Sequence, residues 1–405
     1  MRATTLLSKI LGLNKTRVRN VTCVDEGLVV DVVPSTRVPR CSGCHCRVRT
    51  VHDRYEGRRW RHLDVGPFRV WLRYGLRRVR CPRCGVCVEF VPWAENQSWF
   101  TYDFEEHVAY LAQRADKTTL STLMRVAWRT VGAIIERVLP RHQSGDRLDG
   151  LTHIGVDELS YRRHHEYVTV IVDHVRGGVV WASPGKNAET FKAFFKELGK
   201  ERCAQLEAVT LDMSAAYLKA VTEESPQARI IFDRFHVQRL AHDALDAVRR
   251  EQVREAAPED KHDLKNTRFA LQKNPWNLSA IEEQKVADVQ RTNRPLYRAY
   301  LLKETLAKIL DGGQVNVARK KLLEWADWAA RSRLRPFQKL ARTVRSHLEG
   351  IVAYVATGLS NGRSEGLNGK IRTITRRSFG FHGPTSLIAL IFLCCSGITL
   401  LPVHK

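Results

Sequence analysis

Three acidic side chains occupy positions at which a protein could bind a divalent cation. Asp157 interrupts an apolar stretch in one predicted strand, and Asp212 ends another. An ionised carboxylate among apolar strand residues is costly unless a cation compensates its charge. Glu365 shares one face of a predicted helix with Asn368 and Arg372, and further basic side chains surround it. An acid among so many positive charges is suited to contact a phosphate that is bound to a metal ion. Taken singly, these acids have ordinary alternatives, namely a strand-end cap, a helix N-cap and an ion-pair partner.

A second set of side chains with metal-binding chemistry lies near the beginning of the chain. Six of the ten cysteines form two clusters, Cys41-x-x-Cys44-x-Cys46 and Cys81-x-x-Cys84-x-x-Cys87. Without a signal peptide, thiols stay reduced, so paired knuckles predict a metal site rather than disulfides. Four thiolates match the tetrahedral preference of Zn²⁺. The predicted zinc ligands are Cys41, Cys44, Cys81 and Cys84, with His45, Cys46 and Cys87 as alternative ligands.

The spacing of the two knuckles constrains the fold between them. The 36 residues that separate Cys44 from Cys81 exceed the common ribbon spacing, so one or two hairpins are expected there. Scattered reduced thiols or a redox pair remain the alternative to a metal site.

An arginine-rich segment surrounds the cysteines. Between Arg37 and Arg83 there are fourteen arginines, no lysine and only three acids. The guanidinium group donates in pairs to phosphate oxygens or guanine edges and stacks on aromatic rings. Interleaved with these arginines are Tyr55, Trp60, Phe68, Trp71 and Tyr74. The segment is predicted to be a zinc-stabilised module that contacts DNA, the alternative being a basic solvent-exposed face without a partner.

The charge of the whole chain also indicates an anionic partner. The chain has 405 residues, enough for two to four domains, and 66 Lys plus Arg against 43 Asp plus Glu give a net charge of +23. Such an excess of positive charge attracts polyanions, so nucleic acid and anionic membrane surfaces are the first classes of binding partner to consider. The apolar run from Leu387 to Leu401 is shorter than the roughly 20 residues of a membrane span and predicts a buried helix. No signal peptide is recognisable, so no export is expected. No membrane partner is expected either, although composition alone does not distinguish a membrane surface from nucleic acid.

Helical spacing begins after the cysteine clusters. Asp103 and Glu106 fit an N-terminal capping box, with apolar residues at three- and four-residue intervals behind them. A second helix is expected to be capped at Thr118 or Thr119, and a third is expected to end at Pro140. Three short helices with tight links fit a helix-turn-helix.

The third of these helices would enter the major groove of DNA. Arg125 and Arg129 lie near it and support this interpretation. A small helical bundle without a role in DNA binding would show the same pattern.

Beyond the polar residues 142–147 the periodicity changes to that of strands. Three successive strands, beginning near residues 153, 167 and 178, predict an antiparallel meander. A helix capped at Asn187 follows, then a strand over residues 208–212, a short helix around Tyr217 and a strand over residues 228–233. Three strands followed by alternating helix and strand is the order of a ribonuclease-H-like α/β fold.

The following segment, from about Leu240 to Tyr354, is mostly amphipathic helix. Its breaks are Asn274-Pro275 and Gly312-Gly313. The helical spacing of Leu322, Trp325 and Trp328 is typical of a core, so no chemistry is expected there.

Asp233 and His236 follow the fifth predicted strand, near the proposed acids. A supporting role at the site and an N-cap for the next helix are both open for this pair.

These residues and their order resemble the ISL-three family of bacterial insertion-sequence transposases. The resemblance is carried by the two cysteine knuckles, the helical segment behind them, Gly155-Val-Asp157-Glu-Leu, Leu211-Asp212-Met-Ser, Phe232-Asp233-Arg-Phe-His236-Val and Ser360-Asn-Gly-Arg-Ser-Glu365-Gly-Leu-Asn368-Gly-Lys-Ile-Arg372. The motifs occur in the family's order and cover nearly the whole chain. The additional thiols of Cys46 and Cys87 depart from the family's pattern.

By this resemblance, Asp157, Asp212 and Glu365 take the places of the family's Asp-Asp-Glu (DDE) triad, and the 152 residues between the last two correspond to its helical insertion. The resemblance implies a transposase that binds element ends and catalyses cleavage and transfer of DNA strands. The triad would bind Mg²⁺ or Mn²⁺, and the cysteines a structural Zn²⁺. The implied partners are double-stranded DNA, as terminal inverted repeats and as target, and further copies of the chain in the DNA complex. The implied location is the bacterial cytoplasm, at the nucleoid.

We therefore predict a multidomain α/β protein. The expected segments are an N-terminal segment with the zinc-binding module (1–99), a helix-turn-helix (100–148), the first part of a ribonuclease-H-like catalytic core (149–239), an α-helical insertion (240–355) and the last part of the core with Glu365 (356–405). By analogy with the family, the insertion would position Glu365 and bind DNA.

Two other classes of protein compete with this interpretation. A recombinase could use Tyr217 or Ser364 as nucleophile, but no general base or arginine cluster accompanies either residue. A non-catalytic zinc-containing DNA-binding regulator would leave the three acids and most of the chain unexplained. The phosphate-binding loop Gly-x-x-x-x-Gly-Lys-Ser/Thr is absent from the sequence, which argues against an ATP-driven motor.

Overall fold

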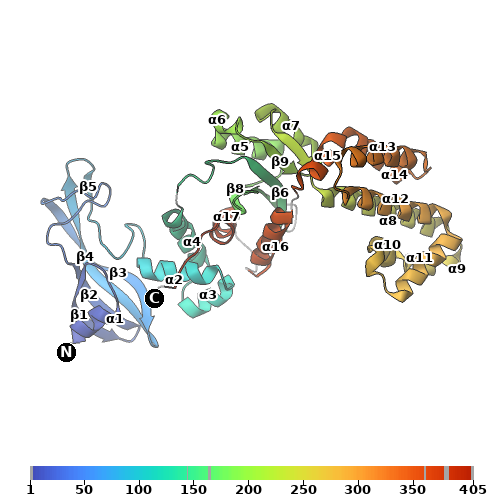
Figure 1. The fold of residues 1–405 in the computed structure, drawn as a ribbon. Coiled ribbons are helices and arrows are strands. Elements are labelled where there is room, and N and C mark those ends of the chain that lie inside the picture. The colour runs from blue at the N-terminus through green and yellow to red at the C-terminus, as the bar shows by residue number, and fades with distance from the viewer. Residues whose placement is uncertain (1–2, 144, 163–165, 360–361, 378–382, 403–405) are drawn as a thin grey trace. The chain divides into compact units, whose positions relative to one another are not determined.

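The computed structural model describes residues 3–143, 145–162, 166–359, 362–377 and 383–402. The chain divides into two compact units, whose elements are labelled in Figure 1. Unit 1 comprises residues 1–143, 376–394 and 398–405, and unit 2 comprises residues 144–375 and 395–397. The segment predicted as the last part of the core, 356–405, is thus divided between the two units.

The first half of unit 1 is built around a five-stranded sheet. Its elements are α1 (Ala3–Ile10), β1 (Thr16–Val24), β2 (Gly27–Pro34), β3 (Val51–Val65), β4 (Phe68–Cys81) and β5 (Gly85–Val88). The strand order is β1-β2-β4-β3, and β5 pairs with β4. The long β3–β4 hairpin fills the space between the cysteine knuckles, which confirms the hairpin predicted there.

The core of this sheet uses aromatic residues from the arginine-rich segment. Trp60 is only 1% exposed and meets the ring of Trp93 edge-on, with the centroids 5.7 Å apart. Val30 and Leu72 are buried in the same cluster. Part of the aromatic pattern assigned to DNA contact therefore serves the core of the module itself.

Three helices follow the sheet in unit 1. They are α2 (Tyr102–Ala112), α3 (Lys117–Met124) and α4 (Trp128–His142). The predicted caps were wrong: the hydroxyl of Thr101 accepts from the N–H of Phe104 at 3.3 Å, and the carboxylate of Asp116 accepts from that of Thr119 at 2.8 Å. Both residues lie upstream of the predicted caps and already satisfy the free N–H groups of the first turn.

The predicted end of the third helix was also wrong. Pro140 lies inside α4, which continues to His142. A proline near the end of a helix removes a single backbone hydrogen bond, which the last turn tolerates.

The helix α17 (Pro384–Cys395) belongs to unit 1 up to Cys394. The side-chain amide of Gln113 donates to the carbonyls of Leu393 at 2.7 Å and Ile398 at 2.9 Å. Ser386 donates to Glu136 of α4 at 2.6 Å. The apolar residues of α17 are largely buried, which confirms the predicted buried helix as far as Cys395. The helix ends there, so residues 396–401 of the predicted apolar run lie outside it. Within the described part of the chain we find no helix with the length and hydrophobicity needed to cross a membrane.

Unit 2 contains a second five-stranded sheet, with strand order β10-β9-β6-β7-β8. Its elements are β6 (His153–Arg162), β7 (Glu166–Asp173), β8 (Gly178–Pro184), α5 (Ala188–Leu198), α6 (Lys200–Cys203), β9 (Ala208–Leu211), α7 (Ala215–Glu224) and β10 (Arg229–Phe232). The first three strands form an antiparallel meander, and β9 and β10 run parallel to β6. The predicted meander and the order of the following elements are confirmed.

Helices make up most of the remainder of unit 2, which includes the last of them, α16, up to Thr375. They are α8 (Arg234–Glu255), α9 (Pro258–Lys265), α10 (Arg268–Gln272), a 3₁₀ turn (Pro275–Asn277), α11 (Ala280–Thr292), α12 (Arg294–Leu310), α13 (Val315–Arg331), α14 (Arg335–Ser346), α15 (Leu348–Thr357) and α16 (Gly362–Arg377). Leu322 and Trp325 are 0% and 2% exposed, which confirms that this face of α13 is core.

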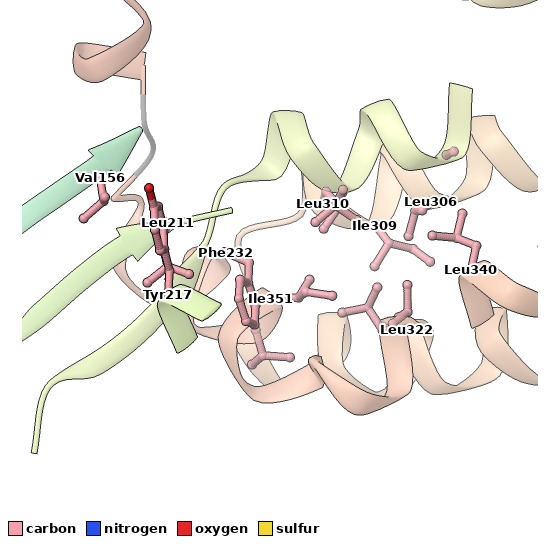
Figure 2. Close-up of a cluster of buried hydrophobic side chains, with 14 of the residues drawn as sticks. Val156, Leu211, Tyr217, Phe232, Leu306, Ile309, Leu310, Leu322, Leu340 and Ile351 are labelled. Atoms are coloured by element: carbon pink, nitrogen blue, oxygen red, sulfur yellow. The ribbon is translucent and has the colours of Figure 1, made fainter. Parts of the chain in front are cut away.

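A large apolar core joins these helices to the sheet. Figure 2 shows it running from Val156 and Leu211 on the strands, past Phe232 and Ile351, to residues of α12, α13 and α14. Gly350 permits this contact, because a Cβ atom there would lie 2.4 Å from the Phe232 ring. The helices are therefore packed on the edge strand β10 rather than tethered by a flexible link.

Candidate active site and zinc site

The register of two parallel strands brings Asp157 and Asp212 together. Residues 153–155 of β6 pair with residues 208–210 of β9, an offset of 55. The same offset, continued two positions further, puts Asp157 beside Asp212, which directly follows β9. Neighbouring residues in register direct their side chains to the same face of a sheet. Two of the three predicted acids therefore share one site at the carboxyl end of β9.

The Asp157 carboxylate is buried and hydrogen-bonded on both oxygens. Its Oδ1 accepts from the backbone N–H of Glu158 at 2.7 Å, and its Oδ2 accepts from the side-chain amide of Asn368 on α16. Burial raises the pKa of Asp157, and the charge of Asp212 raises it further, whereas the N–H of Glu158 and the charges of His236 and Arg372 lower it. The net shift is upward, so ionised Asp157 lacks compensation that a cation would supply.

A third carboxylate, Glu158, adds to this concentration of negative charge. Burial raises its pKa, the phenol of Tyr217 lowers it by hydrogen bonding, and the charges of Asp212 and Asp157 raise it. The Tyr217 hydroxyl also shares a hydrogen bond of 3.0 Å with Thr169. Sequence reasoning did not single out Glu158, although its position next to Asp157 was a visible signal.

The helix α16 contributes Asn368 to the site and places Arg372 one turn further on. Asn368 is 2% exposed, and the charge of Arg372 acts on Asp157. The backbone of Glu365 lies in α16, but its side chain lies outside the described residues. The structure thus brings the helix that bears Glu365 to Asp157, while the position of the Glu365 carboxylate stays a prediction.

Asp233 and His236 have different roles. Asp233 is the N-cap of α8, where its side chain accepts from the N–H of Phe235 at 3.4 Å. His236, in the first turn of the same helix, lies close enough for its charge to lower the pKa of Asp157. Asp233 is therefore a helix cap, and His236 lies near Asp157.

The tyrosine considered as a recombinase nucleophile is inaccessible. Tyr217 is 1% exposed and hydrogen-bonded to Thr169. Burial raises its pKa further from the neutral range. The side chain of Ser364, the other nucleophile considered, lies outside the described residues.

A four-thiol cluster lies in unit 1. The Sγ atoms of Cys41, Cys44, Cys81 and Cys84 are all within 4.8 Å of one another. Burial alone would raise the pKa of Cys41, but hydrogen bonds from its neighbours, chiefly the backbone N–H of Cys44, lower it to about 6. Hydrogen bonds to Cys44 and Cys41 raise the pKa of Cys84 to about 12. Ionisation of all four thiols requires a cation, and the donor set fits tetrahedral Zn²⁺.

The two additional thiols border this cluster. The Cys46 Sγ lies 3.3 Å from that of Cys44 and 3.5 Å from that of Cys81, and the Cys87 Sγ lies 3.2 Å from that of Cys41. The two thiols therefore contact different members of the four-thiol cluster.

The arginines of the zinc module divide into two groups. Nine of the fourteen are exposed, in keeping with a surface for an anionic partner. Others hold the module together: Arg58 stacks on Trp60 and Trp99, with its guanidinium carbon 5.0 Å from each ring centre.

The arginine at the turn of the helix-turn-helix is also engaged. Arg125 adopts a left-handed conformation with φ of 53°, and its guanidinium contacts Asp64 and the carbonyl of Pro67. Arg129, at the start of α4, is exposed. Arg129 is therefore the better placed of the two for a contact with DNA.

Comparison with protein families divides the chain in the same way. Residues 37–84 match the zinc finger of the IS204/IS1001/IS1096/IS1165 transposases, and residues 89–139 match the helix-turn-helix domain of transposase family ISL3. Residues 154–391 match the transposase domain of the same family. The chain belongs to the ISL3 (ISL-three) transposase family.

Relatives of this ISL3 transposase match it over nearly its whole length. It is 38% identical to the transposase for insertion sequence element IS1557 of Mycobacterium tuberculosis, over 98% of this chain and 96% of that one. It is 27% identical to the transposase for IS1001 of Bordetella parapertussis, over 88% of each chain. The protein is accordingly a DNA transposase with a zinc ribbon and a helix-turn-helix domain.

Proposed function

We propose that this ISL3 transposase cleaves and joins DNA by DDE chemistry, with Asp157, Asp212 and Glu365 as the catalytic triad. The observation that carries the proposal is the β6–β9 register, which sets Asp157 beside Asp212 at one end of the sheet. The buried contact of Asn368 with Asp157 brings α16 to the same place. Because Glu365 precedes Asn368 by three residues, nearly one helical turn, the third acid belongs near this site.

The carboxylates would hold the divalent ions that the chemistry requires. Asp157 and Asp212 fit this role because Mg²⁺ and Mn²⁺ prefer oxygen ligands. The two carboxylates also repel each other when no cation lies between them. Two such ions would activate water or a 3′-hydroxyl and stabilise the leaving oxygen of an in-line displacement. Arg372 would supply positive charge towards the scissile phosphate.

We also propose that the sheet of unit 2 is a ribonuclease-H-like core with a helical insertion. The proposal is supported by an antiparallel meander followed by two parallel strands on the other side of β6. The insertion would run from about residue 240 to 355, with its helices packed onto β10.

The remaining parts would recognise DNA. We propose Cys41, Cys44, Cys81 and Cys84 as ligands of a structural Zn²⁺ and the exposed arginines around them as contacts to the terminal inverted repeats. Target DNA would complete the complex, and pairing of two element ends would require at least two copies of the chain. The protein would act at the nucleoid, in the bacterial cytoplasm.

The test is a cleavage assay on oligonucleotides that carry the ends of the protein's own element. We expect nicking with Mg²⁺ or Mn²⁺, none with a chelator, and none from Asp212→Ala, whereas end binding measured by gel shift stays within a few-fold of wild type. Asp327→Ala removes an exposed carboxylate of α13 and is the matched control, which should cleave normally.

Three results would contradict the proposal. Cleavage that persists in Asp212→Ala would rule out the proposed catalytic triad. Binding without cleavage under every divalent ion would indicate a DNA-binding regulator. A denaturant-stable protein–DNA adduct would indicate a covalent recombinase.

A further inference from the structure

A buried amide faces the carboxylate that the proposed function assigns to a metal ion. Asn368 is 2% exposed, and its Nδ2 donates to Oδ2 of Asp157. The other carboxylate oxygen accepts from the backbone N–H of Glu158 at 2.7 Å. Both oxygens of Asp157 are therefore occupied by hydrogen-bond donors, one of which sits on a side chain that can turn.

The other end of the same amide has no donor. Among the residues that the structure describes, none donates a hydrogen bond to Oδ1 of Asn368. Buried polar atoms are nearly always paired, so an unpaired one calls for an explanation, such as a catalytic role or binding of an ion or a water molecule. The oxygen and nitrogen of a carboxamide exchange places when the group turns by half a revolution about its last side-chain bond.

The two orientations of Asn368 suit two states of Asp157. With its nitrogen towards Asp157, the amide compensates part of the carboxylate's buried charge. With its oxygen towards Asp157, two oxygens would repel each other unless a cation lay between them. Amide and carboxylate oxygens are both ligands that Mg²⁺ and Mn²⁺ accept.

We propose that Asn368 is a metal ligand that turns over on binding: its Nδ2 holds Asp157 in the metal-free protein, and its Oδ1 joins Asp157 on the divalent ion. This inference rests on the proposed function, because it takes Asp157 to be a metal ligand. Asn368 would then couple α16, which bears Glu365, to the arrival of the ion.

The test measures the affinity of the full-length, zinc-loaded protein for Mn²⁺ without DNA, by the electron paramagnetic resonance signal of free Mn²⁺. Asn368→Leu has neither an oxygen nor a donor, and we expect its Kd to rise about 10- to 100-fold, as for lost groups around metal ligands. Asn368→Asp keeps an oxygen ligand without a donor, and we expect binding at least as tight as wild type.

Gly369→Asp is the matched control for added charge. Gly369 is the next residue of α16, and a Cβ atom at this position would meet no neighbouring atom within 4 Å, so the same carboxylate is added away from Asp157. We expect it to change the Kd by no more than a few-fold.

Two outcomes overturn the inference and separate it from the proposed function. If Asp157→Ala abolishes Mn²⁺ binding while Asn368→Leu binds like wild type, or while Asn368→Leu and Asn368→Asp are weakened equally, Asn368 is no ligand and the triad stands. If Asp157→Ala itself binds Mn²⁺ like wild type, the metal site and the inference fail together.

Discussion

The zinc site and the acidic site are assembled in opposite ways. The four thiols come from two short knuckles, and the apolar cluster around them contains only Cys41, Val48, Val79 and Cys81 as buried members. Asp157 lies on a strand and Asp212 directly follows one, and the core of these strands extends through the sheet and into the helices of the insertion. Few buried apolar side chains surround the zinc site, whereas a large apolar core lies behind the acidic site.

This difference indicates what each metal would do for the fold. Zinc would supply much of the stability of its module, because little apolar surface is buried around the knuckles. Divalent ions at the acids would contribute function rather than folding, because the core already fixes the strands. The buried charge of Asp157 is a cost that the apolar packing of unit 2 must offset.

The strongest test of this contrast is removal of a proposed zinc ligand. Cys81→Ser should lose its zinc equivalent and open the β4–β5 region, since structural zinc contributes roughly 10 kcal/mol in small zinc domains. Zinc content by a colorimetric assay and limited proteolysis would measure the change, with unit 2 staying resistant. Cys23→Ser, at an exposed thiol outside the cluster, is the control. A full zinc equivalent in Cys81→Ser would refute the predicted ligand set.

The acidic site should depend on apolar packing instead. Gly350→Ala places a methyl group 2.4 Å from the Phe232 ring, where β10 meets α15. Overpacking of this kind costs about 1–3 kcal/mol, which urea unfolding of unit 2 would register. Gly313→Ala, with no atom within 4 Å of its added group, is the control. Equal stability of the two variants would show that the core does not hold the helices as described.

The charge of Asp157 itself provides a smaller, pH-dependent test. Because its folded-state pKa is raised above 3.8, the folded protein keeps this proton to higher pH than the unfolded chain, and stability falls as pH rises through the folded value. Asp157→Asn should therefore stabilise the metal-free protein at pH 8 and lose that advantage as pH falls towards 4. Urea titrations at several pH values measure the difference. An advantage that grows on acidification would contradict the assigned direction.

The smallest effect is expected at the two additional thiols. Cys46→Ser and Cys87→Ser should each retain one zinc equivalent, because the four other thiols remain within 4.8 Å of one another. The measurement is the zinc content of both variants, compared with that of Cys81→Ser under the same conditions. Loss of zinc from either variant would make that thiol a ligand and displace one of the four predicted.

Much of the architecture was accessible from local patterns. The meander of unit 2, the helix capped at Asn187 and the core face of α13 followed from periodicity and capping preferences, and all are confirmed. The caps of α2 and α3 were misplaced because several polar residues near each helix start could accept the same hydrogen bond. Pro140 was given too much weight as a terminator because its cost depends on how much helix follows it.

The sequence by itself determined the kinds of element, the cysteine knuckles and the candidate acids, because backbone periodicity and side-chain chemistry are local properties. Only the tertiary structure decided that Asp157 lies beside Asp212, that Asn368 of α16 binds Asp157, and that α17 belongs to unit 1. These neighbours are set by strand register and by the packing of apolar faces distant along the chain. No local pattern encodes which face meets which.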